Sequence, residues 1–280
     1  MMFLIMSIHP SAVISPEAKI SPEVMIGPYV VIDGRVSIGH GCIIHSGAKL
    51  LGRLTLGARN VVHSTAVLGD WPQDRKYKGE PSEVLIGDDN VFREGVTVHR
   101  GTGLNSRTVI GNRCYFMVNS HVGHNCVVQD DVTLVNGALL GGHVHVAERA
   151  IIGGNTAVHQ FCRVGRLAML SNACCMNVDV PPFFIAMATN TLTQLNAVGL
   201  RRSGMPKESI NAIRKMFQLA FRDMRGLSLS HTLENLPPDI LHVPEVQEVI
   251  AFCKSSKRGI AKFQAWSDRN ISRPAESEEE

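Results

Sequence analysis

Residues 122–146, VGHNCVVQDDVTLVNGALLGGHVHV, place an aliphatic residue at every sixth position. A six-residue period matches neither an amphipathic helix nor a hairpin strand, whose periods are about 3.6 and 2 residues. It is typical of a parallel β-helix, in which short flat strands alternate with turns and neighbouring coils bury each other's interior residues. The stretch therefore predicts a hexapeptide solenoid.

The same phase extends over most of the chain. Of the 29 positions that fall every six residues from Ile8 to Met176, including Leu104, only Asp74 and Glu80 are not large and apolar. A second series, two residues before these positions, is often small, so large and small side chains alternate in a narrow interior. The small members are Ala12, Ala18, Ala48, Ala66, Thr108, Ser120, Ala138, Ala150, Thr156 and Ala168.

The repeat is interrupted at residues 69–83, GDWPQDRKYKGEPSE. Charged residues replace aliphatic ones there, so we predict an external loop, and loops on a rigid scaffold often carry ligand contacts. Gln73, Asp74 and Lys76 offer an acceptor, a charged acceptor and a cation, which suit sugar hydroxyls and phosphate. The alternative is a polar surface loop without a ligand.

The chain changes character after Pro181 and Pro182. Residues 205–221 and 244–259 have apolar residues at helical spacing and predict amphipathic helices. We therefore expect a β-helix domain over residues 8–182, a small α-helical domain over 190–265 and a disordered tail at 266–280. The helical domain is basic, which favours an acidic protein or a phosphate as partner, although a solvated helical face also explains the charge.

Composition indicates a cytoplasmic protein. The chain has 280 residues, of which 44% are hydrophobic and 19% charged. The apolar start MMFLIMS lacks a basic lead and is too short for a signal peptide, and no apolar run is long enough to predict a membrane span. Seven cysteines are an odd number, and a reducing compartment keeps them as thiols. We expect no nucleic-acid partner.

The segment HVGHNC, residues 121–126, raises the question of a metal site. Cys126 falls in the small interior series, whereas His121 and His124 lie on other faces, so zinc would lack a third ligand. We predict no metal site here. Five of the seven cysteines share that series and are expected to pack in the core: Cys42, Cys114, Cys126, Cys162 and Cys174.

Over residues 8 to about 265 the chain resembles the UDP-N-acetylglucosamine acyltransferases that begin lipid A biosynthesis. The resemblance implies a left-handed parallel β-helix with three hexapeptides per coil and a homotrimer with active sites between subunits. It also implies transfer of a 3-hydroxyacyl chain from acyl carrier protein to the sugar 3-hydroxyl of a UDP-sugar, with no bound cofactor. The strings that carry it are PQDRKYKGEP, VTVHRGT, HVGHNC, LGGHV, IIGGNTAVHQFCRVG, DVPPFFIA and LNAVGLRRSG.

With three hexapeptides per coil, His124, Gly142 and Gln160 should lie in one surface column on consecutive coils. Glycine lets a substrate carbonyl approach a bare backbone N–H, which stabilises an oxyanion, and a neutral imidazole takes a proton from an attacking hydroxyl. Exposed histidines on solenoids are also often solvated polar surface, so the column alone does not establish catalysis.

Matched by motif, the resemblance assigns His124 as general base and Gly142 as oxyanion donor. It assigns Gln73, Asp74 and Lys76 to the sugar. Further residues would line the substrate or pantetheine groove or approach the nucleotide phosphates: His121, His143, His159, Gln160, Asn196 and Arg202.

Several positions depart from the family pattern. Asn125 follows His124 where an aspartate is common, and a neutral amide does not stabilise an imidazolium as a carboxylate would. Val198 and Ser203 replace a charged pair, and the loop GTGLNSRT, residues 101–108, is short. Two alternatives therefore remain open, an N-acyltransferase for a 3-amino analogue of the sugar and a non-catalytic trimer that binds carrier or sugar.

Asn172 stands where the family often has a glycine at the floor of the acyl groove, with Met169 beside it. Each excluded methylene forfeits about 0.8 kcal/mol, so blocking a few carbons changes donor choice by roughly ten- to hundredfold. We expect a preference for chains shorter than fourteen carbons and a longer preferred chain in Asn172→Gly. Competition between 3-hydroxyacyl carriers of different length measures both, and a fourteen-carbon preference in the natural protein would contradict this assignment.

Overall fold

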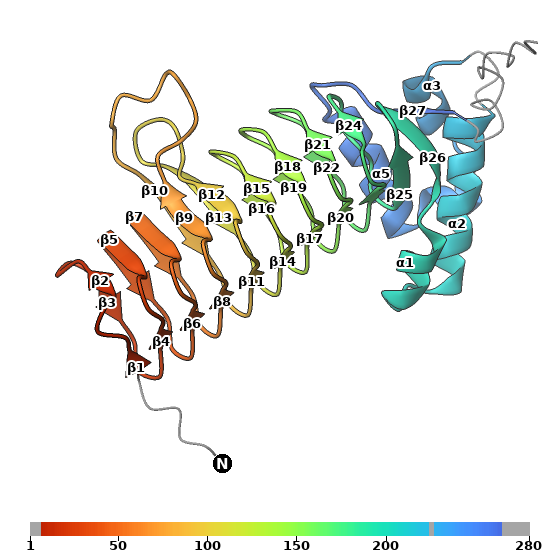
Figure 1. Cartoon of the computed structure of the whole chain (residues 1–280). Coiled ribbons are helices and arrows are strands. Elements are labelled where there is room, and N and C mark those ends of the chain that lie inside the picture. The colour runs from red at the N-terminus through yellow and green to blue at the C-terminus, as the bar shows by residue number, and fades with distance from the viewer. Residues whose placement is uncertain (1–6, 224–226, 265–280) are drawn as a thin grey trace, which may run out of the picture.

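The computed structural model describes residues 7–223 and 227–264 and shows a left-handed parallel β-helix closed at one end by helices (Figure 1). The predicted disordered tail lies outside these residues. Three walls of short strands run along the axis. The first wall contains β1(Ser7–Ile8), β4(Met25–Ile26), β6(Ile43–Ile44), β8(Val61–Val62), β11(Val91–Phe92), β14(Tyr115–Phe116), β17(Thr133–Leu134), β20(Ile151–Ile152) and β23(Met169–Leu170).

The second and third walls share two long strands, β5(Val31–Ile38) and β7(Lys49–Leu56), which bend from one to the other. The other strands of the second wall are β2(Val13–Ile14), β9(Val67–Asp70), β12(Thr97–His99), β15(His121–Val122), β18(Leu139–Leu140), β21(Ala157–Val158) and β24(Cys175–Met176). Those of the third wall are β3(Lys19–Ile20), β10(Ser82–Ile86), β13(Ser106–Ile110), β16(Val127–Val128), β19(His145–Val146) and β22(Arg163–Val164).

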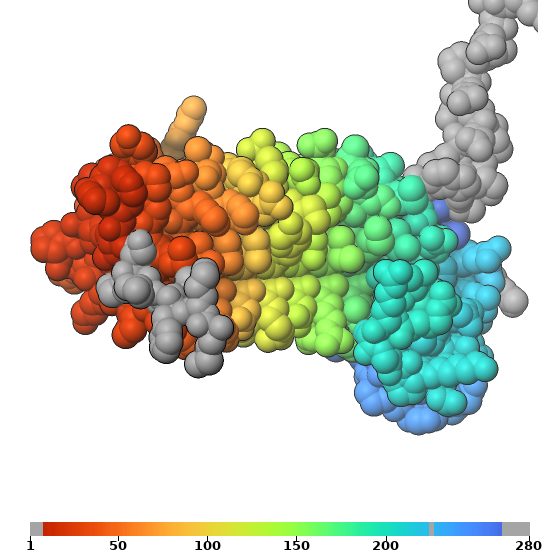
Figure 2. All heavy atoms as spheres, turned by 60° about the horizontal axis from the view of Figure 1, so that its bottom comes forward, coloured from red at the N-terminus to blue at the C-terminus, as the bar shows by residue number. Residues whose placement is uncertain are grey.

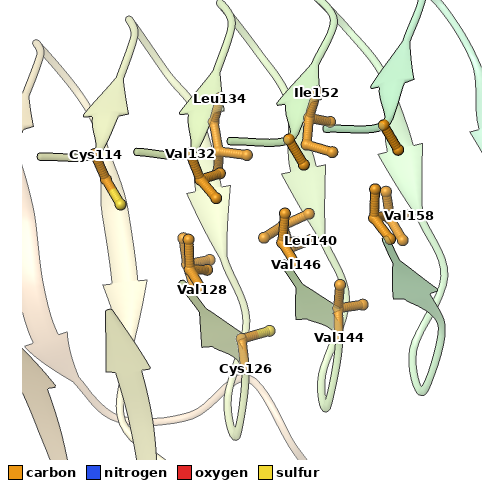
Figure 3. Close-up of a cluster of buried hydrophobic side chains, with 14 of the residues drawn as sticks. Cys114, Cys126, Val128, Val132, Leu134, Leu140, Val144, Val146, Ile152 and Val158 are labelled. Atoms are coloured by element: carbon orange, nitrogen blue, oxygen red, sulfur yellow. The ribbon is translucent and has the colours of Figure 1, made fainter. Parts of the chain in front are cut away.

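Stacked strands pair in parallel, and each residue lies opposite its counterpart on the next coil, as His121 does with Leu139 and Leu139 with Ala157. The aliphatic series forms continuous rows along the interior (Figure 3). All five cysteines of the small series are buried, which confirms their predicted packing role, and burial raises the pKa of the Cys126 thiol to about 12. The interior is therefore the one that the six-residue period predicts.

The register changes at two places. Leu54 pairs with Val84, and Ser82 with Ser106, because residues are inserted between β9 and β10 and between β12 and β13. The first insertion is the predicted loop, which projects from the solenoid (Figure 1). The second corrects one prediction: Leu104 keeps the six-residue phase by count, but it lies in the shorter loop and the residue is 72% exposed.

Buried asparagines connect the coils where the register changes. The Asn90 N–H donates to Asn60 Oδ1 over 2.9 Å, and the Cys114 N–H donates to Asn90 Oδ1 over 2.8 Å. Both side chains are fully buried, and each amide also donates to a main-chain carbonyl. Their hydrogen bonds satisfy polar groups that burial would otherwise leave unpaired.

The helical region covers the C-terminal end of the solenoid (Figure 2). Arg163 from β22 pairs with buried Asp179 at 2.9 Å. Arg166 pairs at 2.7 Å with Glu248 of helix α5(Pro244–Lys254), and this pair ties the helix to the last coils. Strands also continue into this region, where β25(Phe184–Met187) extends the first wall. The elements are β25(Phe184–Met187), β26(Thr191–Leu195), α1(Ala197–Arg202), α2(Lys207–Phe217), a π-helical turn (Gln218–Arg222), α3(Leu229–Glu234), α4(Pro238–Leu241), α5(Pro244–Lys254) and β27(Lys262–Phe263).

Candidate active site

One edge of the solenoid, where the chain turns from the second wall to the third, carries the predicted column of polar residues. His124, Gly142 and Gln160 occupy equivalent positions on three consecutive turns. The next residue of each turn, Asn125, His143 or Phe161, has a positive φ of 60–66°. The His143 N–H donates to the His124 carbonyl over 2.9 Å, and the Phe161 N–H to the Gly142 carbonyl over 3.0 Å. Main-chain hydrogen bonds thus fix the spacing of the column.

The imidazole of His124 lies directly against Gly142. A Cβ atom at residue 142 would come within 2.5 Å of both Cε1 and Nε2 of His124, so only glycine leaves the ring its place. Within residues 7–223 and 227–264 the Gly142 N–H has no hydrogen-bond partner. A free backbone donor therefore stands beside a potential base.

The loop of residues 71–81 brings a carboxylate to the same histidine. Asp74 Oδ2 lies 4.0 Å from His124 Nε2, and both side chains are mostly buried. Asp74 Oδ1 accepts the Lys76 N–H over 2.9 Å. That hydrogen bond, together with the nearby His124, lowers the pKa of Asp74, so the side chain is a carboxylate at neutral pH.

The opposite edge of the His124 ring faces its own neighbour in sequence. His124 Nδ1 lies 2.8 Å from Asn125 Oδ1. Asn125 Oδ1 also accepts the Thr102 N–H over 2.8 Å, and Asn125 Nδ2 donates to the Thr102 carbonyl over 3.3 Å. The shorter inserted loop is therefore hydrogen-bonded to the turn that carries His124.

Two further histidines lie next to His124, and both have neutral rings. Burial, followed by the neighbouring His99 and His124, lowers the pKa of His121 to about 4, and its Nδ1 lies 2.8 Å from the Thr97 hydroxyl. Burial also lowers the pKa of His143, whose ring crosses that of His124 at 87° with a centroid distance of 5.3 Å. Both imidazoles are uncharged at pH 7 and offer hydrogen bonds without repelling a cation on His124.

His124 lies between two clefts that share Gln73, His124 and Gln160. The larger, of about 600 Å³, is lined mainly by charged and polar side chains, and the smaller, of about 330 Å³, by histidines and bare glycines. The larger adds Asp74, Arg75, Lys76, Thr102, His143 and Phe161; the smaller adds His99, His121, Gly123, Gly141, Gly142 and His159.

The remaining predicted residues lie elsewhere on the chain. Met169, Asn196 and Arg202 line a cleft of about 550 Å³ with Val198 and Ser203, at the edge between the third wall and the first. The structure does not bring this cleft together with His124 within one chain. We call it the third cleft.

Two side chains predicted to bind substrate have hydrogen-bonding roles in the fold. Asn196 caps helix α1 by accepting the Gly199 N–H over 3.0 Å, and its Nδ2 donates to the buried Leu167 carbonyl. Asn172 accepts the Gly154 N–H over 2.8 Å on a turn between the first and second walls, and it does not line the third cleft.

Three residues of the larger cleft were not predicted as site residues: Arg75, Thr102 and Phe161. Phe161 stacks on His143 with a centroid distance of 4.5 Å, and counting one coil on from His143 would have found it. Thr102 lies in an insertion, where the register gives no signal.

Within the described ranges, no group of three or more His, Cys, Asp or Glu side chains is arranged to hold a metal ion. The same ranges contain no helix with the length and hydrophobicity of a membrane span.

Family profiles match both parts of the chain. The profile "Bacterial transferase hexapeptide (six repeats)" matches residues 17–52, and "Udp N-acetylglucosamine O-acyltransferase; Domain 2" matches residues 179–261. The same topology occurs in solved structures. The UDP-N-acetylglucosamine acyltransferase of Francisella novicida is 33% identical with a TM-score of 0.86, covering 96% of this chain and 99% of that chain. The O-acyltransferase of Moraxella catarrhalis is 36% identical with a TM-score of 0.86, covering 92% and 100%.

Sequence relatives agree with the structural ones. The acyl-(acyl-carrier-protein)–UDP-N-acetylglucosamine O-acyltransferase of Anaeromyxobacter sp. (strain Fw109-5) is 40% identical over 215 residues, which are 76% of this chain and 83% of the relative. Its counterpart in Alkalilimnicola ehrlichii is 42% identical over 201 residues, 70% of this chain and 76% of the relative. The chain therefore belongs to the family of acyl-(acyl-carrier-protein)–UDP-N-acetylglucosamine O-acyltransferases.

Proposed function

We propose that this protein transfers a 3-hydroxyacyl chain from acyl carrier protein to the 3-hydroxyl of UDP-N-acetylglucosamine, the first step of lipid A biosynthesis. The observation that carries the proposal is the position of His124 between two clefts, beside the free N–H of Gly142. A transfer between two substrates needs a base at the point where they meet. The names of the relatives supply the chemical identity of both substrates.

The residues of the column perform the transfer in two steps. His124 Nε2 takes the proton of the sugar hydroxyl as its oxygen bonds to the thioester carbon, and the Gly142 N–H donates to the oxyanion that forms. The C–S bond then breaks, and the leaving thiolate takes the proton back from the imidazolium. A positioned base contributes about 10² to 10⁴ in rate and one oxyanion donor about 10² to 10³.

Asp74 stabilises the imidazolium form of His124 that arises during the transfer. Its carboxylate lies on the Nε2 side of His124, where the transferred proton arrives. The interaction forms only when the imidazole is protonated, so it favours the transition state over the resting enzyme. The step needs no metal or organic cofactor, because base, oxyanion donor and leaving group come from His124, Gly142 and the phosphopantetheine thioester of the donor.

The position of the third cleft supports a site that is completed by two chains. Arg202 supplies a cation for the nucleotide phosphates, but it lies on a different edge of the solenoid from His124. We infer a cytoplasmic homotrimer in which the third cleft of one subunit faces the His124 edge of the next, because a cyclic assembly repeats one such contact around its axis.

Product analysis tests the proposed reaction. Purified protein with 3-hydroxyacyl carrier protein and UDP-N-acetylglucosamine should give an O-acylated nucleotide sugar by mass spectrometry, and His124→Ala should reduce turnover at least about a hundredfold without unfolding the protein. A product that forms only from a 3-amino sugar would replace the acceptor, and near-normal turnover in His124→Ala would remove the base from the mechanism.

Mixed oligomers test the shared site. His124→Ala and Arg202→Ala should each lose most activity, but co-expressed chains should recover activity at about a quarter of the sites, where an intact His124 edge meets an intact third cleft. Mixing His124→Ala with Gly142→Ala is the matched control, because both changes damage the same edge and no intact edge can form. Equal recovery in the two mixtures would rule out a site built from two chains.

Gly142→Ala tests the contact between glycine and imidazole. The added methyl group keeps the N–H but displaces the His124 ring, so we expect kcat to fall about a hundredfold while the melting temperature changes little. Gly154→Ala is the control, since its Cβ would meet no atom closer than 3.4 Å. Unchanged kcat in Gly142→Ala would show that the ring position is not critical.

A further inference from the structure

Asn125 and the shorter inserted loop lie side by side next to His124. Asn125 directly follows His124 in the chain, and Thr102 lies in the loop between β12 and β13. The Asn125 side chain contacts the main chain of Thr102 at both ends of its amide. Asn125 and Thr102 therefore form one hydrogen-bonded unit.

The partners of Asn125 fix the orientation of its amide. A backbone N–H can only donate, so the atom that faces the Thr102 N–H at 2.8 Å must be the oxygen. A backbone carbonyl can only accept, so the atom that faces the Thr102 carbonyl at 3.3 Å must be the NH₂ group. Exchanging the oxygen and the NH₂ group by flipping the amide would break both hydrogen bonds.

The oriented amide in turn decides where the hydrogen of His124 lies. His124 Nδ1 lies 2.8 Å from the same Asn125 oxygen, which has no hydrogen to give. Nδ1 must therefore carry the hydrogen, and Nε2 holds the free electron pair. We propose that Asn125, held by the Thr102 main chain, is a positioning residue that locks His124 in the Nδ1–H tautomer and so presents Nε2 as the base. The catalytic part of this proposal rests on the proposed function.

Because residue 125 is uncharged, the counter-charge of the base lies on the other side of the ring. An aspartate would place a carboxylate on the Nδ1 side of the ring, whereas in this chain that side carries an amide. Among the described residues, the only acid that pairs with His124 is Asp74, 4.0 Å from Nε2. Other titratable groups near the ring are His121 from the same coil and His143 from the next. His99 and His159 line the smaller cleft, and the cations Arg75 and Lys76 line the larger one.

The two inserted loops supply the groups on the two sides of the ring. The Thr102 main chain, from the shorter loop, holds Asn125 on the Nδ1 side. The Lys76 N–H, from the longer loop, donates to Asp74 on the Nε2 side. The shorter loop therefore positions the tautomer, and the longer loop positions the carboxylate.

The tautomer is measured directly, without turnover. Protein labelled with ¹⁵N-histidine, studied above the pKa of the ring, should show a protonated Nδ1 and a bare Nε2 for His124, assigned by the loss of these signals in His124→Gln. A resting enzyme with the hydrogen on Nε2 would overturn the proposal. This result is independent of whether His124 acts as the base, so it separates failure of this proposal from failure of the proposed function.

Asn125→Asp tests the electrostatic consequence. A carboxylate beside Nδ1 favours the imidazolium and raises the pKa of His124, so the acid limb of the pH dependence of kcat/KM should move up by about one unit or more. Activity then falls at low pH and stays near normal above the new pKa, because only the neutral ring accepts a proton. A profile that superimposes on that of the natural protein would contradict the proposal.

Asn125→Ala removes the acceptor altogether. The two neutral tautomers of His124 can then interconvert, so kcat should fall at least about tenfold while the KM values change less than about twofold. Asn155→Asp and Asn155→Ala are the matched controls, because Asn155 has a similar positive φ of 52° on an exposed turn away from His124. An unchanged kcat in Asn125→Ala, or an equal loss in the controls, would show that residue 125 acts only on the turn.

Discussion

Main-chain hydrogen bonds along the solenoid axis determine where every other group in this protein lies. Each coil bonds to the next at the same position, so a residue is held beside its counterpart on the following coil. Interior rows of aliphatic side chains follow from that spacing, and so does the outer column of His124, Gly142 and Gln160. An imidazole and a free backbone donor can thus be juxtaposed by coil stacking alone, on a scaffold built mostly from very short strands.

Departures from the regular coil supply what stacking cannot. Both insertions leave the solenoid between the second and third walls. The longer loop brings Asp74 to His124, and the shorter loop brings the Thr102 main chain to Asn125. The buried Asn60 and Asn90 connect coils where the register changes, so their hydrogen bonds help the core to accommodate the loops. The stacked column and the loop residues that contact it therefore have separate structural origins.

The six-residue period predicted the interior, the buried cysteines and the position of the external loop, because coil stacking is a local rule that the sequence repeats. It failed at Leu104, where an insertion conserves the count but not the geometry. It could not reveal that Asn196 caps a helix or that Asn172 binds the Gly154 N–H, since these contacts follow from side-chain hydrogen bonding without a period. That His124 and the third cleft lie on different edges of the solenoid could be recognised only from the three-dimensional arrangement of the walls.

The positive φ at Asn125, His143 and Phe161 lowers the stability of these turns but places three side chains around His124. A left-handed conformation costs a residue with a Cβ atom about 1 kcal/mol, and glycine adopts it without that strain. Replacement by glycine would relieve the backbone, yet it would remove the amide, the ring and the stacked phenyl group that surround His124. Selection for a more robust fold and selection for catalysis therefore act in opposite directions on these turns, and in a lineage that no longer needed the reaction they would be expected to drift toward glycine first.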